Sequence, residues 1–190
     1  MGCRRIRLSR YGLLPPYFLQ GIFVWRADHA RLEQRISIIQ VFKQSWSVHA
    51  RDATAYYFEV VNKSEALTIR AIRVQLAEIS PEVENLNWLP VILHQKHDNA
   101  PLPQRAKNFD LNPGEPKHID LVSAFVQDDH FEIEHIVSGV NREVRGAGHH
   151  RLKVMVTAED MPALFVWFDV WINEAGVLQC KMEDTGKSAV

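Results

Sequence analysis

Two short turn signatures, each set among residues of alternating polarity, constrain the fold of this chain more than any other feature. Residues 60–64 (Val-Val-Asn-Lys-Ser) close one apolar run, and residues 111–115 (Leu-Asn-Pro-Gly-Glu) open another. Apolar residues then recur at every second position in 72–76 and again in 119–121. Because successive side chains of a strand point to opposite faces of a sheet, this period predicts half-buried antiparallel strands packed face to face.

The rest of the chain after residue 35 has the same character, with strand-length runs separated by turn residues. No segment after residue 44 sustains the 3.6-residue period of a helix, so the pattern predicts an all-β antiparallel β-sandwich of about seven to nine strands. Two longer connections, 96–116 and 138–149, interrupt it. We expect strands at 36–43, 54–62, 69–79, 88–95, 117–126, 131–137, 150–158, 163–173 and 177–183.

The run 164–172 is apolar at nearly every position. It therefore indicates a central strand, or one whose outer face is covered by the N-terminal segment or by a partner. Trp167 and Trp171 in this run, together with Trp88, fit core or interface positions, and an exposed group of them would mark a docking patch. Residues 173–176 (Asn-Glu-Ala-Gly) then predict a hairpin loop with Gly176 at positive φ.

Composition supports one globular domain with extensions. The chain has 190 residues, of which 46% are hydrophobic and 24% charged, and these are ordinary values for a folded domain. We expect a basic and apolar arm with a short helix at 1–35, a sandwich domain at 36–184 and a flexible tail at 185–190. Cys3 and Cys180 lie far apart and predict no disulfide, which favours a reducing compartment.

Charge is unevenly distributed along the sequence. Residues 1–50 carry eight basic and two acidic residues, a net charge of +6, so the remaining 140 residues carry −7. A basic arm before an acidic body suits an anionic membrane surface or an acidic partner, or else docking of the arm on its own domain. An acidic body disfavours nucleic acid as a partner. Two prolines interrupt the apolar part of the arm, so the sequence supports a cytoplasmic or membrane-peripheral location and not secretion.

Three stretches resemble a known family. Residues 56–66 with 72–76, the Leu-Asn-Pro-Gly-Glu turn at 111–115, and residues 150–160 are similar to the motifs of bacterial immunoglobulin-like modules of the adhesion-related kind. The resemblance covers roughly residues 54–172. It implies an immunoglobulin-like sandwich, as in uncharacterised bacterial proteins in which such a sandwich follows an N-terminal membrane segment. It implies no reaction.

Two groups of residues are candidates for binding. His94, His97 and Asp98 have side chains that ligate Zn²⁺ and lie where a strand enters a proline-rich loop, although residues three apart in a strand face opposite ways. Arg142 and Arg145 in a glycine-containing loop, with Arg151 just after it, would form a basic surface for an anionic partner, or a solvated loop. We predict no cofactor.

The sequence lacks the Gly-x-Ser-x-Gly and His-Glu-x-x-His motifs, and Gly186-Lys187-Ser188 has no helix after it to complete a phosphate loop. We therefore expect a non-enzymatic interaction or scaffold domain that is membrane-proximal or part of a larger assembly and binds a protein partner or itself. The alternatives are a metal- or small-ligand-binding sandwich that uses the His94 region, and an unrecognised hydrolase.

Overall fold

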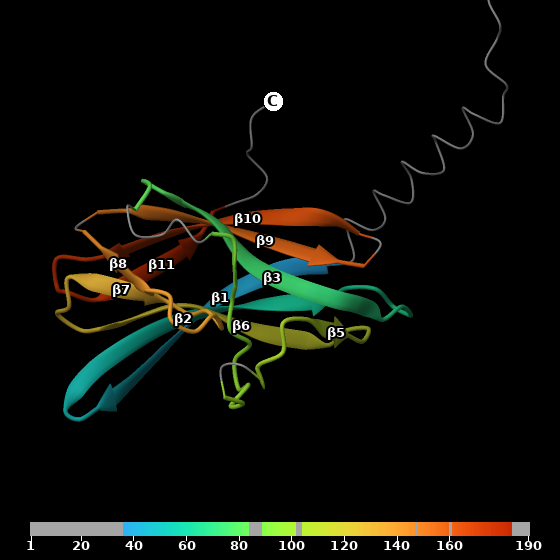
Figure 1. Cartoon of the computed structure of the whole chain (residues 1–190), viewed down its shortest axis with the longest axis horizontal. Helices are drawn as coiled ribbons and strands as arrows, with labels where there is room; N and C mark the ends of the chain where they lie inside the picture. Colours follow the sequence, from blue (N-terminus) through green and yellow to red (C-terminus); the bar gives the residue numbers. More distant parts are fainter. Residues whose placement is uncertain (1–35, 84–88, 102–103, 147, 160, 184–190) are drawn as a thin grey trace, which may run out of the picture.

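A computed structural model describes residues 36–83, 89–101, 104–146, 148–159 and 161–183. They form two antiparallel sheets stacked as a β-sandwich (Figure 1), which confirms the predicted fold class. The expected arm at 1–35, Trp88 and the tail at 185–190 lie outside the described residues. The strands are β1 (Ile36–Val48), β2 (Arg51–Asn62), β3 (Ile69–Ser80), β4 (Val91–Ile92), β5 (Phe109–Leu111), β6 (Pro116–Phe125), β7 (His130–Ile133), β8 (Glu143–Arg145), β9 (His150–Ala158), β10 (Met161–Ile172) and β11 (Leu178–Met182).

The chain passes from one sheet to the other between β2 and β3. One sheet has five strands in the order β1-β2-β6-β7-β8, and the other has six, in the order β11-β10-β9-β3-β4 with β5 also paired to β3. Neighbours in each sheet run antiparallel. Strand β10 lies between β9 and β11, so the apolar run at 164–172 is an internal strand of its sheet.

The core fills the space between the sheets. Phe58 on β2 and Phe168 on β10 are fully buried, and their ring centroids lie 5.1 Å apart across this space. Val154 on β9 and Ile119 on β6 are also fully buried. Burial of each such side chain stabilises the fold by about 1.5–3 kcal/mol, which is why the period of two in the sequence decides which face of each strand turns inward.

The two turn signatures of the sequence are in contact. Asn62, at the end of β2, is fully buried, and its Nδ2 donates to the carbonyl oxygens of Leu67 (2.7 Å) and Leu111 (3.0 Å). Its Oδ1 accepts from the Ser64 N–H at 2.9 Å, and its backbone carbonyl accepts from the N–H of Gly114 at 2.8 Å. One buried amide thus ties both turns to β2.

The structure differs from the expected strands at several places, and the strand expected at 131–137 ends as β7 at Ile133. Strand β1 runs to Val48 and not to residue 43, because the tight turn at His49 and Ala50 pairs its second half with β2. The expected strand at 88–95 is reduced to β4, with isolated bridges at Leu93 and Gln95. The two long connections contain the short strands β5 and β8, whose three residues are too few to carry a readable period.

Candidate interaction surfaces

The structure brings two of the three candidate metal ligands together, but His94 meets the backbone carbonyl of Asp98 and not its carboxylate. His94 Nδ1 lies 2.9 Å from Oδ2 of Asp120 on β6, and Nε2 lies 3.1 Å from the backbone carbonyl of Asp98. The Asp98 carboxylate accepts instead from backbone N–H groups of the following loop, while the His97 side chain is exposed. In the described part of the chain, no group of three or more His, Cys, Asp or Glu side chains is arranged to hold a metal ion.

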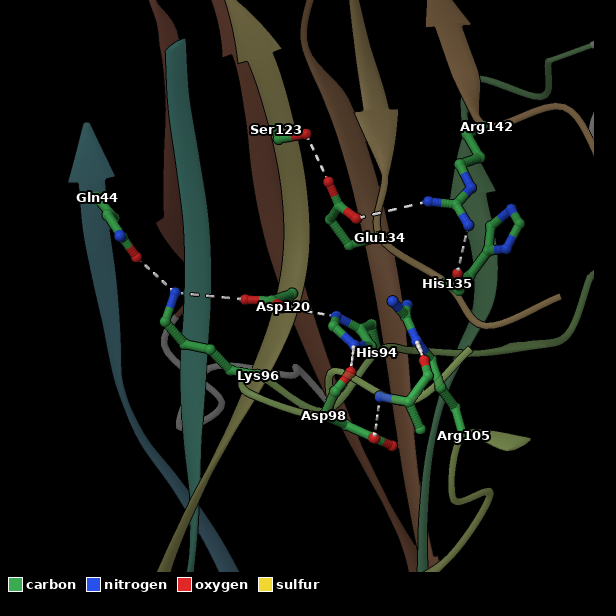
Figure 2. Close-up of polar contacts among 11 residues, drawn as sticks. Gln44, His94, Lys96, Asp98, Arg105, Asp120, Ser123, Glu134, His135 and Arg142 are labelled. Atoms are coloured by element: carbon green, nitrogen blue, oxygen red, sulfur yellow. Dashed lines mark hydrogen bonds and ion pairs between the residues drawn. The ribbon is translucent and has the colours of Figure 1, made fainter. Parts of the chain in front are cut away.

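His94 belongs to a hydrogen-bonded chain of polar groups on the outer face of the five-stranded sheet (Figure 2). Both of its ring nitrogens face oxygen acceptors, so the ring satisfies both only when it is doubly protonated. The hydrogen bond to Asp120 accordingly raises the pKa of His94. Asp120 also lies 3.6 Å from Nζ of Lys96, which donates to Gln44 at 2.6 Å and sits over the Tyr57 ring at 3.9 Å.

A second polar group lies on the neighbouring part of the same sheet (Figure 2). Ser123 donates to Glu134 at 2.6 Å, and Arg142 lies 3.8 Å from the other oxygen of that carboxylate. Arg142 also donates to the backbone carbonyl of His135. The His135 side chain is fully buried, and burial, together with the positive charge of Arg142, lowers its pKa to about 4.

Each of the three candidate arginines has an acidic neighbour of its own. Arg142 is half-buried beside Glu134. Arg145 is exposed and binds Glu143, the residue two positions earlier on β8, at 2.7 Å. Arg151 on β9 makes a two-point contact with Glu183, at 2.6 Å for each pair of atoms. The loop therefore offers little uncompensated positive charge.

The outer side of β10 carries three large aromatic residues. Phe165, Trp167 and Trp171 alternate with the buried residues of this strand and point away from the core. Phe165 is 45% exposed, the Trp residues are half-buried, and His149 stacks on Trp171 with ring centroids 4.7 Å apart. We call these three residues the aromatic face.

Cationic side chains of β9 cover part of the aromatic face. Lys153 Nζ lies 5.3 Å from the ring centroids of both Phe165 and Trp167, and the Arg151 guanidinium lies 4.7 Å from Trp167. Glu78 lies 3.2 Å from Lys153, just as Glu183 pairs with Arg151. Aromatic rings, cations and acids thus share the outer surface of β9 and β10, where cation–π contacts of this kind contribute about 0.5–1 kcal/mol each.

An apolar pocket adjoins the aromatic face at the beginning of β1. Its walls include Ile36, Leu164 and Phe165, with Pro162 and Met161 from the start of β10. Ile36 is the first described residue, and it lies beside Phe165 of the aromatic face in this pocket.

The sequence alone could not reveal the most connected residue of the polar chain. Asp120 is 26 positions from His94, and only the pairing of β6 with the segment after β4 makes them neighbours. Its single sequence signal was its place among the polar, outward-facing positions of the segment 117–126. Trp46, 38% exposed at the far end of β1, lies beyond the expected end of that strand and so was also missed.

Comparison of the chain with models of protein families, with curated proteins and with solved structures finds no match. Among the described residues, no helix is long and apolar enough to cross a membrane.

Proposed function

We propose that this protein is a non-enzymatic interaction domain that is held at a membrane surface by residues 1–35, with its aromatic face turned toward that surface. The observation that carries the proposal is the pocket shared by Ile36 and Phe165, since Ile36 is the residue that directly follows the basic, apolar segment in the sequence. Trp side chains accompanied by Lys and Arg are the residues that proteins place at membrane interfaces.

The charge distribution suits a membrane contact in which the aromatic face supplies apolar contact and the basic segment supplies positive charge. The cations of the aromatic face are compensated by Glu78 and Glu183, so that face adds apolar contact more than charge. The excess of basic residues lies within 1–50, where it would attract an anionic surface, at about 1 kcal/mol for each cation near the lipid.

The hydrogen bonds already made by His94 and Ser123 support a non-enzymatic role. His94 has both ring nitrogens engaged, and a general base needs one of them free. Ser123, in the second polar group of the same sheet, donates its hydroxyl to Glu134 and not to a histidine. These side chains bind one another as a support for the sheet.

We further infer that the sandwich is immunoglobulin-like. In that fold the strands are ordered A-B-E-D in one sheet and G-F-C in the other. In the five-stranded sheet the strand order β1-β2-β6 corresponds to A-B-E, and in the six-stranded sheet the order β10-β9-β3 corresponds to G-F-C. Strand β7 follows β6 in the chain and takes the place of strand D, which is the departure from that pattern.

Liposome flotation tests the membrane part of the proposal. The full chain is compared on neutral phosphatidylcholine vesicles and on vesicles with about one third phosphatidylserine, beside a shortened chain that begins at Ile36. We expect the full chain to float with the anionic vesicles and the shortened chain to remain at the bottom. Equal behaviour of the two chains would remove the membrane from the proposal.

A matched pair of variants tests the aromatic face within the full chain. Phe165→Ser removes an exposed ring from the face, and Leu67→Ser removes a similarly exposed apolar side chain from the turn after β2. We expect Phe165→Ser to reduce flotation several-fold and Leu67→Ser to leave it unchanged. A similar loss in both variants would mean that the aromatic face has no special part in docking.

A further inference from the structure

Strand β1 forms an open edge of the five-stranded sheet. It pairs with β2 on one side from Ile36 to Val48, and it is the last strand of the sheet on the other. The remaining sheet ends are much shorter, since β4, β8 and β11 have two, three and five residues. Monomeric proteins usually blunt long edges with charges or proline. In β1, Lys43 is the single charged residue, and there is no proline.

The same strand exposes apolar side chains. Ile39 is 45% exposed, and Trp46 and Val48 are 38% exposed. These are three of the six large hydrophobic residues that are exposed in the described part of the chain, so the exposed apolar surface is concentrated on this edge. In Figure 1 the turn that joins β1 to β2 stands away from the other strands, and residues 43–48 of β1 are all exposed.

The hairpin geometry fixes which backbone groups face the open edge. His49 and Ala50 both have positive φ, as a two-residue hairpin turn requires, and they join the paired residues Val48 and Arg51. In such a hairpin this closing pair is hydrogen-bonded, and hydrogen-bonded pairs alternate with non-hydrogen-bonded pairs along the ladder. The N–H and C=O groups of Lys43, Ser45 and Ser47 therefore point away from β2, to the open edge.

We propose that β1 pairs with β1 of a second copy of this chain, antiparallel and in a register centred on Gln44. The two five-stranded sheets then become one continuous sheet across a twofold axis. Lys43 exchanges main-chain hydrogen bonds with Ser45 of the partner subunit, and Val41 does so with the partner's Ser47. The proposal does not depend on the membrane role, because it uses the other sheet.

We infer a second copy of the chain as the partner of this edge because β1 is complementary to itself. In this register Phe42 lies opposite Trp46 of the partner subunit on both sides of the axis, at non-hydrogen-bonded positions where side chains approach most closely. Phe42 is already held by stacking on Tyr57, at 5.2 Å between centroids. A register centred on Lys43 would instead oppose two like charges. An isologous contact of this kind closes on itself and does not propagate.

Sedimentation analysis of the full chain over a range of concentrations tests the pairing. We expect a reversible monomer–dimer equilibrium. Ser45→Pro removes one outward N–H without touching the bonds to β2, and we expect it to weaken dimerisation at least tenfold. Ser45→Ala keeps the N–H and should dimerise like the original chain. A chain that stays monomeric at every concentration, or a dimer that Ser45→Pro leaves intact in its folded form, would overturn the proposal.

Cysteine cross-linking tests the register and does not depend on how well the proline variant folds. Across the twofold axis the two Gln44 Cα atoms would be about 4.5 Å apart, within disulfide range. The two Ser47 residues would be separated by six positions, or about 20 Å. With Cys3→Ser in both chains, Gln44→Cys should form a covalent dimer under mild oxidation far faster than Ser47→Cys. Equal rates, or no dimer from Gln44→Cys, would contradict the proposed pairing.

Discussion

Buried polar side chains join segments of this sandwich that are distant in the sequence. Asn62 is the most connected of these, since its amide and its backbone carbonyl bind four backbone groups from two separate turns. A buried carbonyl or N–H that loses its partner costs about 1–3 kcal/mol, so such a residue matters more than its size suggests. The sequence placed Asn62 in a turn, but only the folded chain joins that turn to Leu111.

Replacement of Asn62 by Ala should lower the free energy of unfolding by about 3 kcal/mol, because it leaves the carbonyls of Leu67 and Leu111 without their donor. Thr68→Ala is the matched control, since its hydroxyl bonds to Asn112 on the exposed surface and should cost about 0.5 kcal/mol or less. Urea unfolding of both variants gives the two values. Equal, small losses would show that the Asn62 bonds do not support the fold.

Acid should destabilise the protein through its buried histidines. His135 stays neutral in the folded chain, with a pKa of about 4 against 6.5 for the free side chain, so the unfolded chain binds a proton first as the pH falls. The stability that depends on neutral His135 is complete above about pH 6.5 and is lost as the pH falls toward about 4. From about pH 7 to about pH 5 the loss is about 2 kcal/mol.

His150 acts in the same direction, because burial lowers its pKa as well. His94 acts in the opposite direction, since its pKa is raised and its contribution is greatest in acid. His135→Asn keeps an acceptor near that of Nδ1, and it should flatten the decline in urea stability between these two pH values, whereas exposed His97→Asn should not. A decline that is equally steep in both variants would contradict the assignment to His135.

At the scale of elements, the turns are where the sequence was most informative. Gly176 was expected at positive φ in a hairpin, and it has φ of 71°, with its N–H bonded to the carbonyl of Asn173. Turn residues act locally, so their chemistry can be read directly from the sequence. The strands β5 and β8 and the shortened β4 could not be predicted, because pairing with distant strands decides them.

Two glycines with the same backbone conformation should respond differently to alanine. Gly114 and Gly176 have φ of 72° and 71°. At either position alanine would have to adopt the left-handed conformation, which costs about 1–2 kcal/mol. A Cβ at Gly114 meets open space, whereas a Cβ at Gly176 would lie 2.9 Å from Cα of Gln127. We expect Gly176→Ala to lower the free energy of unfolding by about 1–3 kcal/mol more than Gly114→Ala.

The comparison is made by urea unfolding under identical conditions. Gln127 itself has positive φ and donates its N–H to the carbonyl of Gly176, so this contact joins two backbones that have little freedom to move apart. Equal losses in the two variants would mean that the segment around Gln127 shifts to admit the methyl group.

At the scale of the whole molecule, the predicted sandwich is confirmed, while the predicted candidate sites remain predictions. Periodicity reports which face of a strand is buried, and that is enough to define two stacked sheets. It does not report which outward residues from different strands become neighbours. The aromatic face illustrates this, because the apolar run at 164–172 indicated an internal or covered strand, which β10 is by position, but not that its outward rings lie beside Arg151 and Lys153 of β9.

The two proposed surfaces belong to different sheets and can therefore act together. The aromatic face lies on β10 in the six-stranded sheet, and the open edge is β1 in the five-stranded sheet. Pairing through β1 would give an assembly two arms and two aromatic faces. Two linked contacts bind a surface far more tightly than one whenever both can reach it.

Quenching of Trp fluorescence by brominated lipids tests the central claim most directly. The full chain is prepared with Trp25, Trp46 and Trp88 each replaced by Phe, so that Trp167 and Trp171 alone report. The protein is then mixed with anionic vesicles with and without brominated acyl chains. We expect clear quenching by the brominated lipid, because both rings should lie at the lipid surface. Binding of the protein to the vesicles without any quenching would contradict docking through the aromatic face.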